Sequence, residues 1–230
     1  MKKTVLLIAI IFVGVLALSV GIRLFLSPDF TGFGKDPLGE PVVTHLLSDD
    51  EEALGGGGSK GGAYNWEDHP VFIVGDSLTQ GARSEIEKIA GDKATIDGKT
   101  SRNMSAGVSI IGGWETSGAL TSDAIIVVCL AHNITDSTVR DAQKIVEMIK
   151  PGQSLIMMTG HGRNNMGAIN EYIRSLPNVY SYITVADWDL TIAQNTSLLS
   201  DDGIHIGRRQ GNELYASLIL AALEKTQPMP

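Results

Sequence analysis

The chain has 230 residues, a length that suits one globular domain with attached segments. Its net charge of −8 argues against a nucleic-acid partner, because binding phosphates requires a basic patch. Hydrophobic residues make up 43% of the chain and charged residues 19%, which excludes disorder throughout, and a single cysteine, Cys129, excludes an intrachain disulfide framework.

The first 26 residues predict a membrane anchor or an export signal. Residues 4–22 carry no charge and follow Lys2 and Lys3. At about 1.5 Å per residue, this stretch nearly spans the hydrocarbon core of a bilayer. It exceeds the apolar part of most cleavable signals, so we favour one transmembrane helix with a cytoplasmic N-terminus and an extracellular domain. The alternative is a signal cleaved near residues 17–19, which would release a secreted protein.

Residues 27–68 are predicted to form a flexible tether. The acidic run at residues 49–52 favours an extended chain, and the glycine-rich run at residues 55–62 favours a flexible one. The sequence Gly-Gly-Gly-Gly-Ser within the second run is also typical of an engineered linker. The catalytic domain is then expected at residues 69–227.

Within residues 69–227, short apolar runs alternate with amphipathic stretches. This alternation predicts a parallel sheet with helices on both faces. In such a sheet, ligands bind beyond the carboxyl ends of the strands, so catalytic residues are expected there. Strands are expected at Val71–Gly75, 124–130, Ser154–Met158 and 179–186, and helices at 82–90, 135–150, 168–176 and 211–225.

Two short motifs, one at each end of this domain, predict a catalytic triad. Ser77 follows the first strand in the sequence Gly-Asp-Ser-Leu, where its hydroxyl either projects from the sheet edge or caps the next helix. Asp202 lies three residues before His205, close enough to orient the imidazole and leave Nε2 free to take a proton from serine. Thr79 excludes the Gly-x-Ser-x-Gly elbow of α/β-hydrolases.

The two motifs together resemble those of the SGNH (GDSL) hydrolase family, over residues 71–223. The sequences at residues 96–102, 127–133 and 185–188 are most similar to the extracellular SGNH domains of bacterial peptidoglycan O-acetyltransferases. The resemblance implies an α/β fold, a flavodoxin-like three-layer α/β/α sandwich with a parallel sheet. It also implies an enzyme that acts on esters without a metal or a cofactor.

The resemblance further implies the roles of individual residues. Ser77 would be the nucleophile, His205 the general base and then acid, and Asp202 the residue that orients His205. The oxyanion hole would combine the backbone N–H groups of Ser77 and Ser101 with the side-chain amide of Asn133. Ser101 stands where the family has a glycine, and its N–H serves equally if the backbone φ allows.

Three further residues are candidates for binding substrate. His132 adjoins the expected oxyanion amide, His161 follows the third expected strand, and Trp188 could form the floor of a sugar site. Two others are expected to be structural. Asp76 points away from its neighbour in an extended chain, and Cys129 lies within an apolar strand as an inert core residue.

These observations predict an exported, membrane-tethered serine esterase that cleaves O-acyl, most simply O-acetyl, esters of a cell-envelope glycan or a small ester. One alternative is an O-acetyltransferase acting on peptidoglycan or another cell-wall polysaccharide, with a membrane protein as acyl donor. Another is a glycan-binding module that has lost catalysis. A metallohydrolase using His132, His161 and His205 ranks last, because their spacing lacks the paired i, i+4 histidines of helical metal sites.

Overall fold

The structure is a computed structural model, and it describes residues 64–162 and 165–230. The predicted anchor, and the predicted tether as far as residue 63, lie outside these residues. In the described ranges, no helix combines the length and the apolar character that crossing a membrane would need.

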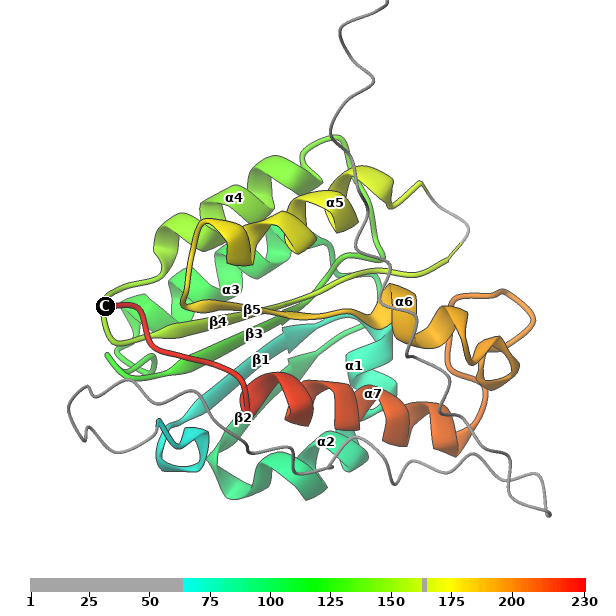
Figure 1. The fold of residues 1–230 in the computed structure, drawn as a ribbon, viewed down its shortest axis with the longest axis horizontal. Coiled ribbons are helices and arrows are strands. Elements are labelled where there is room, and N and C mark those ends of the chain that lie inside the picture. Colours follow the sequence, from blue (N-terminus) through cyan, green and yellow to red (C-terminus); the bar gives the residue numbers. More distant parts are fainter. Residues whose placement is uncertain (1–63, 163–164) are drawn as a thin grey trace, which may run out of the picture. The chain divides into compact units, whose positions relative to one another are not determined.

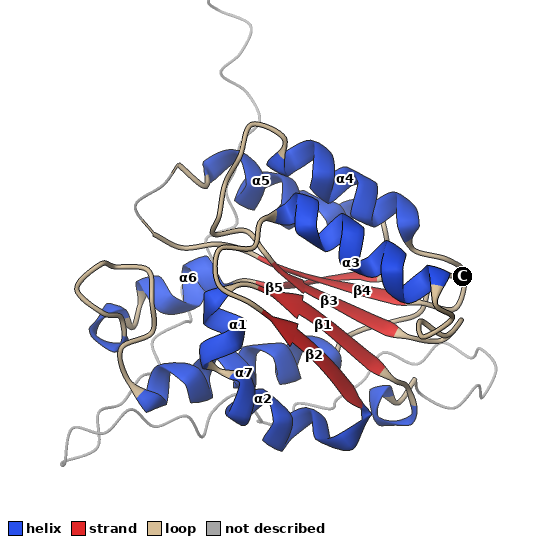
Figure 2. Ribbon diagram, turned by 180° about the vertical axis from the view of Figure 1, so that it is seen from behind, coloured by secondary structure: helices blue, strands red, loops and turns tan. Residues whose placement is uncertain are grey.

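In the described residues, five parallel strands form one sheet in the order β2-β1-β3-β4-β5 (Figures 1 and 2). This is the flavodoxin-like strand order, and it confirms the predicted α/β fold class. The order reverses between β1 and β3, and in folds of this kind ligands generally bind beyond the carboxyl ends of the two strands at such a reversal. The strands are β1 (Val71–Gly75), β2 (Ala94–Gly98), β3 (Ile125–Cys129), β4 (Ser154–Met158) and β5 (Ile183–Ala186).

Helices cover both faces of the sheet, so the described residues form three layers. One face carries α3 (Met104–Thr116), α4 (Thr138–Met148) and α5 (Gly167–Ser175), as Figure 2 shows. The other face carries α1 (Ser77–Gly81), α2 (Arg83–Ala90), α6 (Trp188–Ala193) and α7 (Arg209–Leu223). Short 3₁₀ helices lie at η1 (Trp66–Asp68), η2 (Gly91–Lys93), η3 (Leu176–Asn178) and η4 (Thr196–Leu198).

The two apolar cores follow from the alternation of side chains along the strands. In β3, Ile126 and Val128 pack toward α3 and α4, whereas Ile125 and Val127 pack toward α7. All four side chains are fully buried. A strand covered on both faces has no polar side, which is why the uninterrupted apolar run at residues 124–130 predicted it.

Each strand and helix expected from the sequence is present, with ends displaced by a few residues, but β2, α1, α3 and α6 were not predicted. Strand β2 is an edge strand whose side chains stay partly exposed, so it lacks an apolar run. Helix α3 contains several glycines, which weaken its helical signal. A Cβ on Gly107 would come within 2.6 Å of the end of the Leu130 side chain, which would then have to shift.

The last residues of the predicted tether pack against the domain. Tyr64 stacks on His69 with ring centroids 4.5 Å apart, and Trp66 packs against the core beneath α7. These aromatic side chains gain burial by packing, and the boundary at residue 69 stays a prediction.

Candidate active site

Ser77 is the first residue of α1 and follows β1 after a single residue. Asp76 is the N-cap of this helix, since its Oδ1 accepts a hydrogen bond from the Leu78 N–H at 3.0 Å. The turn is tight, and a Cβ on Gly75 would overlap the Thr79 side chain. Because Asp76 performs the capping, the Ser77 hydroxyl is not needed for it and is available for chemistry.

The structure brings Ser77 together with His205 and Asp202. Ser77 Oγ lies 3.0 Å from His205 Nε2, and His205 Nδ1 lies 2.6 Å from Asp202 Oδ2. A carboxylate only accepts hydrogen bonds, so Nδ1 carries the proton and Nε2 can accept one from the serine hydroxyl. The three side chains are therefore arranged as a nucleophile, a base and the residue that orients the base.

Asp202 also organises its own loop. Its Oδ1 accepts hydrogen bonds from the backbone N–H groups of Ile204 and His205, both at 2.9 Å. The hydrogen bond from His205, followed by these two backbone bonds, lowers the pKa of Asp202 to about 2. A bridge between Leu199 and Ile206 closes the loop at its base. Asp202 thus stays ionised at neutral pH and holds the imidazole in one orientation.

The triad is open to solvent. The His205 side chain is 51% exposed and that of Asp202 is 44% exposed. A bulky substrate such as a polymer can approach a site of this kind without first entering a deep cavity. The same openness gives water access to any intermediate formed on Ser77.

Ser101 lies in the loop between β2 and α3 with a φ of +64°, and it is the one non-glycine residue with positive φ in the described part of the chain. Such a backbone costs a non-glycine residue about 1 kcal/mol or more, so surrounding contacts must maintain it. Gln80 supplies them, because its Oε1 accepts hydrogen bonds from both the N–H and the hydroxyl of Thr100 at 2.9 Å. The Lys99 N–H also donates to the Gly75 carbonyl at 3.1 Å.

The sequence interpretation missed Gln80. The signal that could have revealed it is its position on α1, three residues after Ser77, which places the two side chains on neighbouring parts of the helix surface. Helix α1 thus carries the nucleophile and also anchors the loop that holds Ser101.

Asn133 follows β3 and contacts the loop between β2 and α3 that contains Ser101. Its Nδ2 donates to the Arg102 carbonyl at 2.8 Å, and Arg102 is held by an ion pair with Asp97 at 2.8 Å. An amide nitrogen carries two hydrogens, so one remains to donate to a substrate. The backbone N–H groups of Ser77 and Ser101 with the Asn133 amide remain the predicted oxyanion hole.

Two of the three residues predicted to bind substrate are buried, which corrects that expectation. Trp188 has no exposed surface and packs edge-to-face on Tyr215, with ring centroids 5.1 Å apart. His132 is 4% exposed and lies 3.1 Å from Asp76. Both side chains lie in the core beneath the site, and neither has surface left for a substrate.

His161 is the third such residue, and it is partly exposed. Its Nδ1 lies 2.9 Å from Asp189, which also forms an ion pair with Arg174 at 2.8 Å. Burial raises the pKa of Asp189, but the hydrogen bonds from Arg174 and His161 outweigh it, and the pKa falls below its ordinary value. A Cβ on Gly162 would come within 2.7 Å of Ile204, so this loop lies beside the loop of His205. Substrate contact by His161 stays a prediction.

The structure also bears on the role of Cys129 and on the possible metal site of His132, His161 and His205. Cys129 is fully buried, and burial raises the pKa of its thiol to about 12, so it is an inert core residue as expected. His132, His161 and His205 each pair with a different aspartate. Across residues 64–162 and 165–230, no group of three or more His, Cys, Asp or Glu could hold a metal ion.

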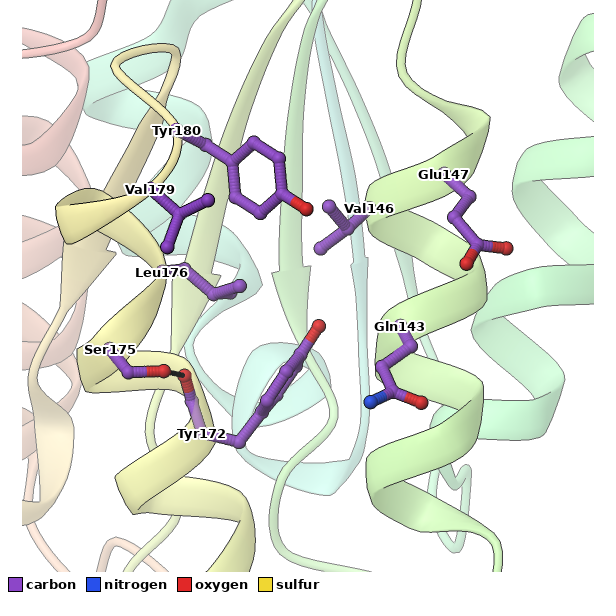
Figure 3. Close-up of a pocket in the computed structure, with 8 residues that line it drawn as sticks. All are labelled: Gln143, Val146, Glu147, Tyr172, Ser175, Leu176, Val179 and Tyr180. Atoms are coloured by element: carbon purple, nitrogen blue, oxygen red, sulfur yellow. Dashed lines mark hydrogen bonds between the residues drawn. The ribbon is translucent and has the colours of Figure 1, made fainter.

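A separate cavity of about 390 Å³ lies between α4 and the segment that follows α5 (Figure 3). Tyr172 and Tyr180 both extend toward it. Its lining contains none of the predicted site residues and consists of Gln143, Val146, Glu147, Tyr172, Ser175, Leu176, Val179 and Tyr180. The catalytic geometry therefore belongs to the open sheet edge at Ser77 and not to this cavity.

The arrangement of strands and helices is similar to that of solved ester-acting enzymes. The C-terminal catalytic domain of Streptococcus pneumoniae peptidoglycan O-acetyltransferase A, solved with a methylsulfonyl adduct, is 23% identical with a TM-score of 0.63, over 70% of this chain and 96% of that one. A lipolytic protein of the G-D-S-L family from Veillonella parvula is 15% identical with a TM-score of 0.56, over 66% and 97%. The fold is that of the SGNH (GDSL) hydrolases.

A catalytic mutant of an acetylxylan esterase from Geobacillus stearothermophilus has the same fold. It is 11% identical with a TM-score of 0.51, over 67% of this chain and 94% of that one. No family model matches the chain, and no curated protein matches it. The structural likeness confirms, at the level of the fold, the family resemblance that the sequence motifs predicted.

Proposed function

We propose that this domain is a serine esterase that cleaves O-acyl, most simply O-acetyl, esters of a cell-envelope glycan. One observation carries the proposal: Ser77 Oγ lies 3.0 Å from His205 Nε2, and His205 Nδ1 lies 2.6 Å from Asp202. This geometry activates a serine hydroxyl for attack on a carbonyl carbon.

The reaction proceeds in two displacements. Ser77 Oγ attacks the ester carbonyl while His205 Nε2 takes its proton, and His205 then returns that proton to the leaving sugar oxygen. The resulting acyl-enzyme is cleaved by water, with His205 again acting as the base. During both steps the negative charge on the carbonyl oxygen is stabilised by the backbone N–H groups of Ser77 and Ser101 and by the Asn133 amide.

Three observations support a glycan ester as substrate. The triad is open enough for a polymer. Two of the similar structures are named a peptidoglycan O-acetyltransferase and an acetylxylan esterase, and both names refer to acetyl groups on polysaccharides. Residues 1–26 predict a membrane anchor or export signal, which would place the domain outside the cell beside the envelope.

An O-acetyltransferase is the second candidate, and the likeness to the peptidoglycan O-acetyltransferase domain favours it. Transfer requires the acyl-enzyme to react with a sugar hydroxyl in preference to water, which demands restricted water at the site. The half-exposed His205 and Asp202 do not restrict water, so we favour hydrolysis. A transferase would further need an acyl donor, which a membrane protein partner could supply.

A glycan-binding module without catalysis is the third possibility from the sequence. Two sequence features favour it: Ser101 stands where the family has a glycine, and the bulky His132 adjoins Asn133. The positive φ of Ser101 keeps a glycine-like backbone at this position, so the substitution does not by itself disable the site. The complete triad geometry also argues for an enzyme.

The first test is hydrolysis of a chromogenic acetyl ester by the purified 230-residue chain. We expect turnover that resists a chelator, is abolished by Ser77→Ala, and is retained by Ser84→Ala, a matched change at an exposed serine of α2. Full activity in Ser77→Ala would contradict the serine mechanism, and loss of activity with the chelator would favour the metallohydrolase.

The second test separates hydrolysis from transfer. The chain is supplied with an activated acetyl ester and glycan oligomers, and mass spectrometry counts acetylated glycan against free acetate. We expect free acetate to predominate. Predominantly acetylated glycan would establish the transferase in place of the esterase.

A further inference from the structure

A second histidine–aspartate pair lies directly behind the nucleophile. His132 Nδ1 is 3.1 Å from Asp76 Oδ2, and the two side chains are almost completely buried. The other oxygen of Asp76 accepts the Leu78 N–H at 3.0 Å as the cap of α1. One carboxylate thus joins the first turn of the nucleophile helix to the loop that follows β3.

The position of His132 is not explained by packing. A carboxylate accepts hydrogen bonds, so the ring nitrogen that faces Asp76 carries a proton. The other nitrogen, Nε2, is buried without a hydrogen-bond partner in the described structure. An unpartnered buried polar atom is costly, and an aliphatic side chain would fill this space without that cost. What the histidine provides is the bond from Nδ1 to Asp76.

His132 and Asp76 are each adjacent in sequence to a residue that is expected to take part in the reaction. Asp76 precedes Ser77, and His132 precedes Asn133. Asn133 in turn donates to the Arg102 carbonyl at 2.8 Å, in the loop that carries Ser101. The bond between His132 and Asp76 therefore connects the nucleophile turn to the residue that is expected to donate to the oxyanion.

We propose that His132 is a positioning residue, which sets the distance between the Ser77 hydroxyl and the Asn133 amide through its hydrogen bond to Asp76. This inference rests on the proposed esterase function. It replaces the substrate-binding role that the sequence suggested for His132. An oxyanion donor stabilises the transition state only when it is held in place before the reaction, so misplacing it lowers kcat and leaves substrate binding nearly unchanged.

A pair of amide variants tests which ring nitrogen matters. The amide N–H of His132→Asn takes the place of Nδ1–H, whereas the longer His132→Gln places its N–H near Nε2. We expect His132→Asn to keep kcat within about tenfold of the parent and His132→Gln to lower it by about 10- to 100-fold, both with little change in KM. Equal kcat values in the two variants, or a change confined to KM, would overturn the proposal.

A double-mutant cycle tests whether His132 acts through Asn133. In the Asn133→Ala background the donor is gone, so His132→Gln is expected to change kcat by no more than about twofold. Losses that multiply in the double variant would show that His132 acts independently of Asn133, which contradicts the proposal.

The parent protein provides a readout that does not depend on how the variants fold. The ¹⁵N shifts of the His132 ring should show a protonated Nδ1 and an unprotonated Nε2, and the reverse tautomer would overturn the proposal. This spectrum is independent of any substrate. Absence of ester turnover in the parent would instead contradict the proposed function, so the two failures are distinguishable.

Discussion

Two histidine–aspartate pairs flank Ser77, and they differ in burial and in what their second ring nitrogen faces. In the pair His205–Asp202 both side chains are about half exposed, and Nε2 faces the Ser77 hydroxyl at 3.0 Å. In the pair His132–Asp76 both are buried, and Nε2 has no partner in the described residues. The same two side chains can therefore move a proton in one setting and only hold a loop in the other.

This difference shows that the chemistry of a histidine–aspartate pair depends on whether solvent and substrate can reach it. His205 can exchange its proton with Ser77 and with an incoming substrate. His132 is buried beneath the turn, where a substrate cannot reach it.

The largest effect is expected from Ser77→Ala. Removing the nucleophile should lower kcat by about 10⁴- to 10⁶-fold. The thermal midpoint should remain that of the parent, because Asp76 and not Ser77 caps α1. Rate measurements on the chromogenic ester, with circular dichroism during heating, check both parts. A large fall in the midpoint would mean that Ser77 has a structural role as well.

Asp202→Asn is expected to have the next largest effect. The asparagine amide donates toward Nδ1 and so favours the tautomer whose Nε2 is protonated, which should lower kcat by about 10⁴-fold as in the serine-protease template. Asp201→Asn, the adjacent control, should stay close to the parent because Asp202 is the carboxylate that faces Nδ1. If both variants lost activity equally, or Asp201→Asn lost more, the assignment of Asp202 would be wrong.

Asn133→Ala should lower kcat by about 10²- to 10³-fold with little change in KM, which is the effect of losing one oxyanion donor. Steady-state kinetics over a range of ester concentrations measure the two constants separately. An increase in KM alone would identify Asn133 as a residue that binds the ground state, and the oxyanion hole would then have to lie elsewhere.

The smallest effect concerns stability and pH. The pKa of Asp202 is lowered from 3.8 to about 2 by its hydrogen bonds, so its stabilising contribution is present above about pH 4 and is lost as the pH falls through about 2. Because the pair is half exposed, solvent screens it, and Asp202→Asn should lower the thermal midpoint by only about 1–3 °C at pH 5.

That difference between parent and Asp202→Asn should be smaller at pH 2.5, where part of the contribution is already lost. Thermal melts of both proteins at the two pH values measure it. A difference that grew on acidification would mean that the Asp202 carboxylate destabilises the folded loop, opposite in sign to what its hydrogen bonds predict.

Two features of the predicted site are local in the sequence. Asp202 and His205 are three residues apart, so one turn of chain brings them together whatever surrounds them. Ser77 follows an apolar strand, which the five residues Val71–Gly75 were enough to predict. The strands β1, β3 and β4 were predicted because burial on both faces leaves an uninterrupted apolar run.

The parts that were missed depend on contacts between distant segments. His132 and Asp76 are separated by 56 residues, and nothing in either segment indicates that they meet. Trp188 was a candidate for the floor of a sugar site, yet it fills the space beside Tyr215. Gln80 became recognisable only when the loop after β2 was seen to lie against α1.

The sequence alone determined the alternation of strands and helices, because this follows from periodicity. The family resemblance of its two end motifs predicted the flavodoxin-like class and the candidate nucleophile, base and orienting carboxylate. The tertiary structure decided which polar residues are exposed and which are buried, that a serine with positive φ replaces a glycine, and that Asp76 caps α1 and binds His132. Burial and the direction of a hydrogen bond arise when separate segments pack together, and that packing is not encoded in any one of them.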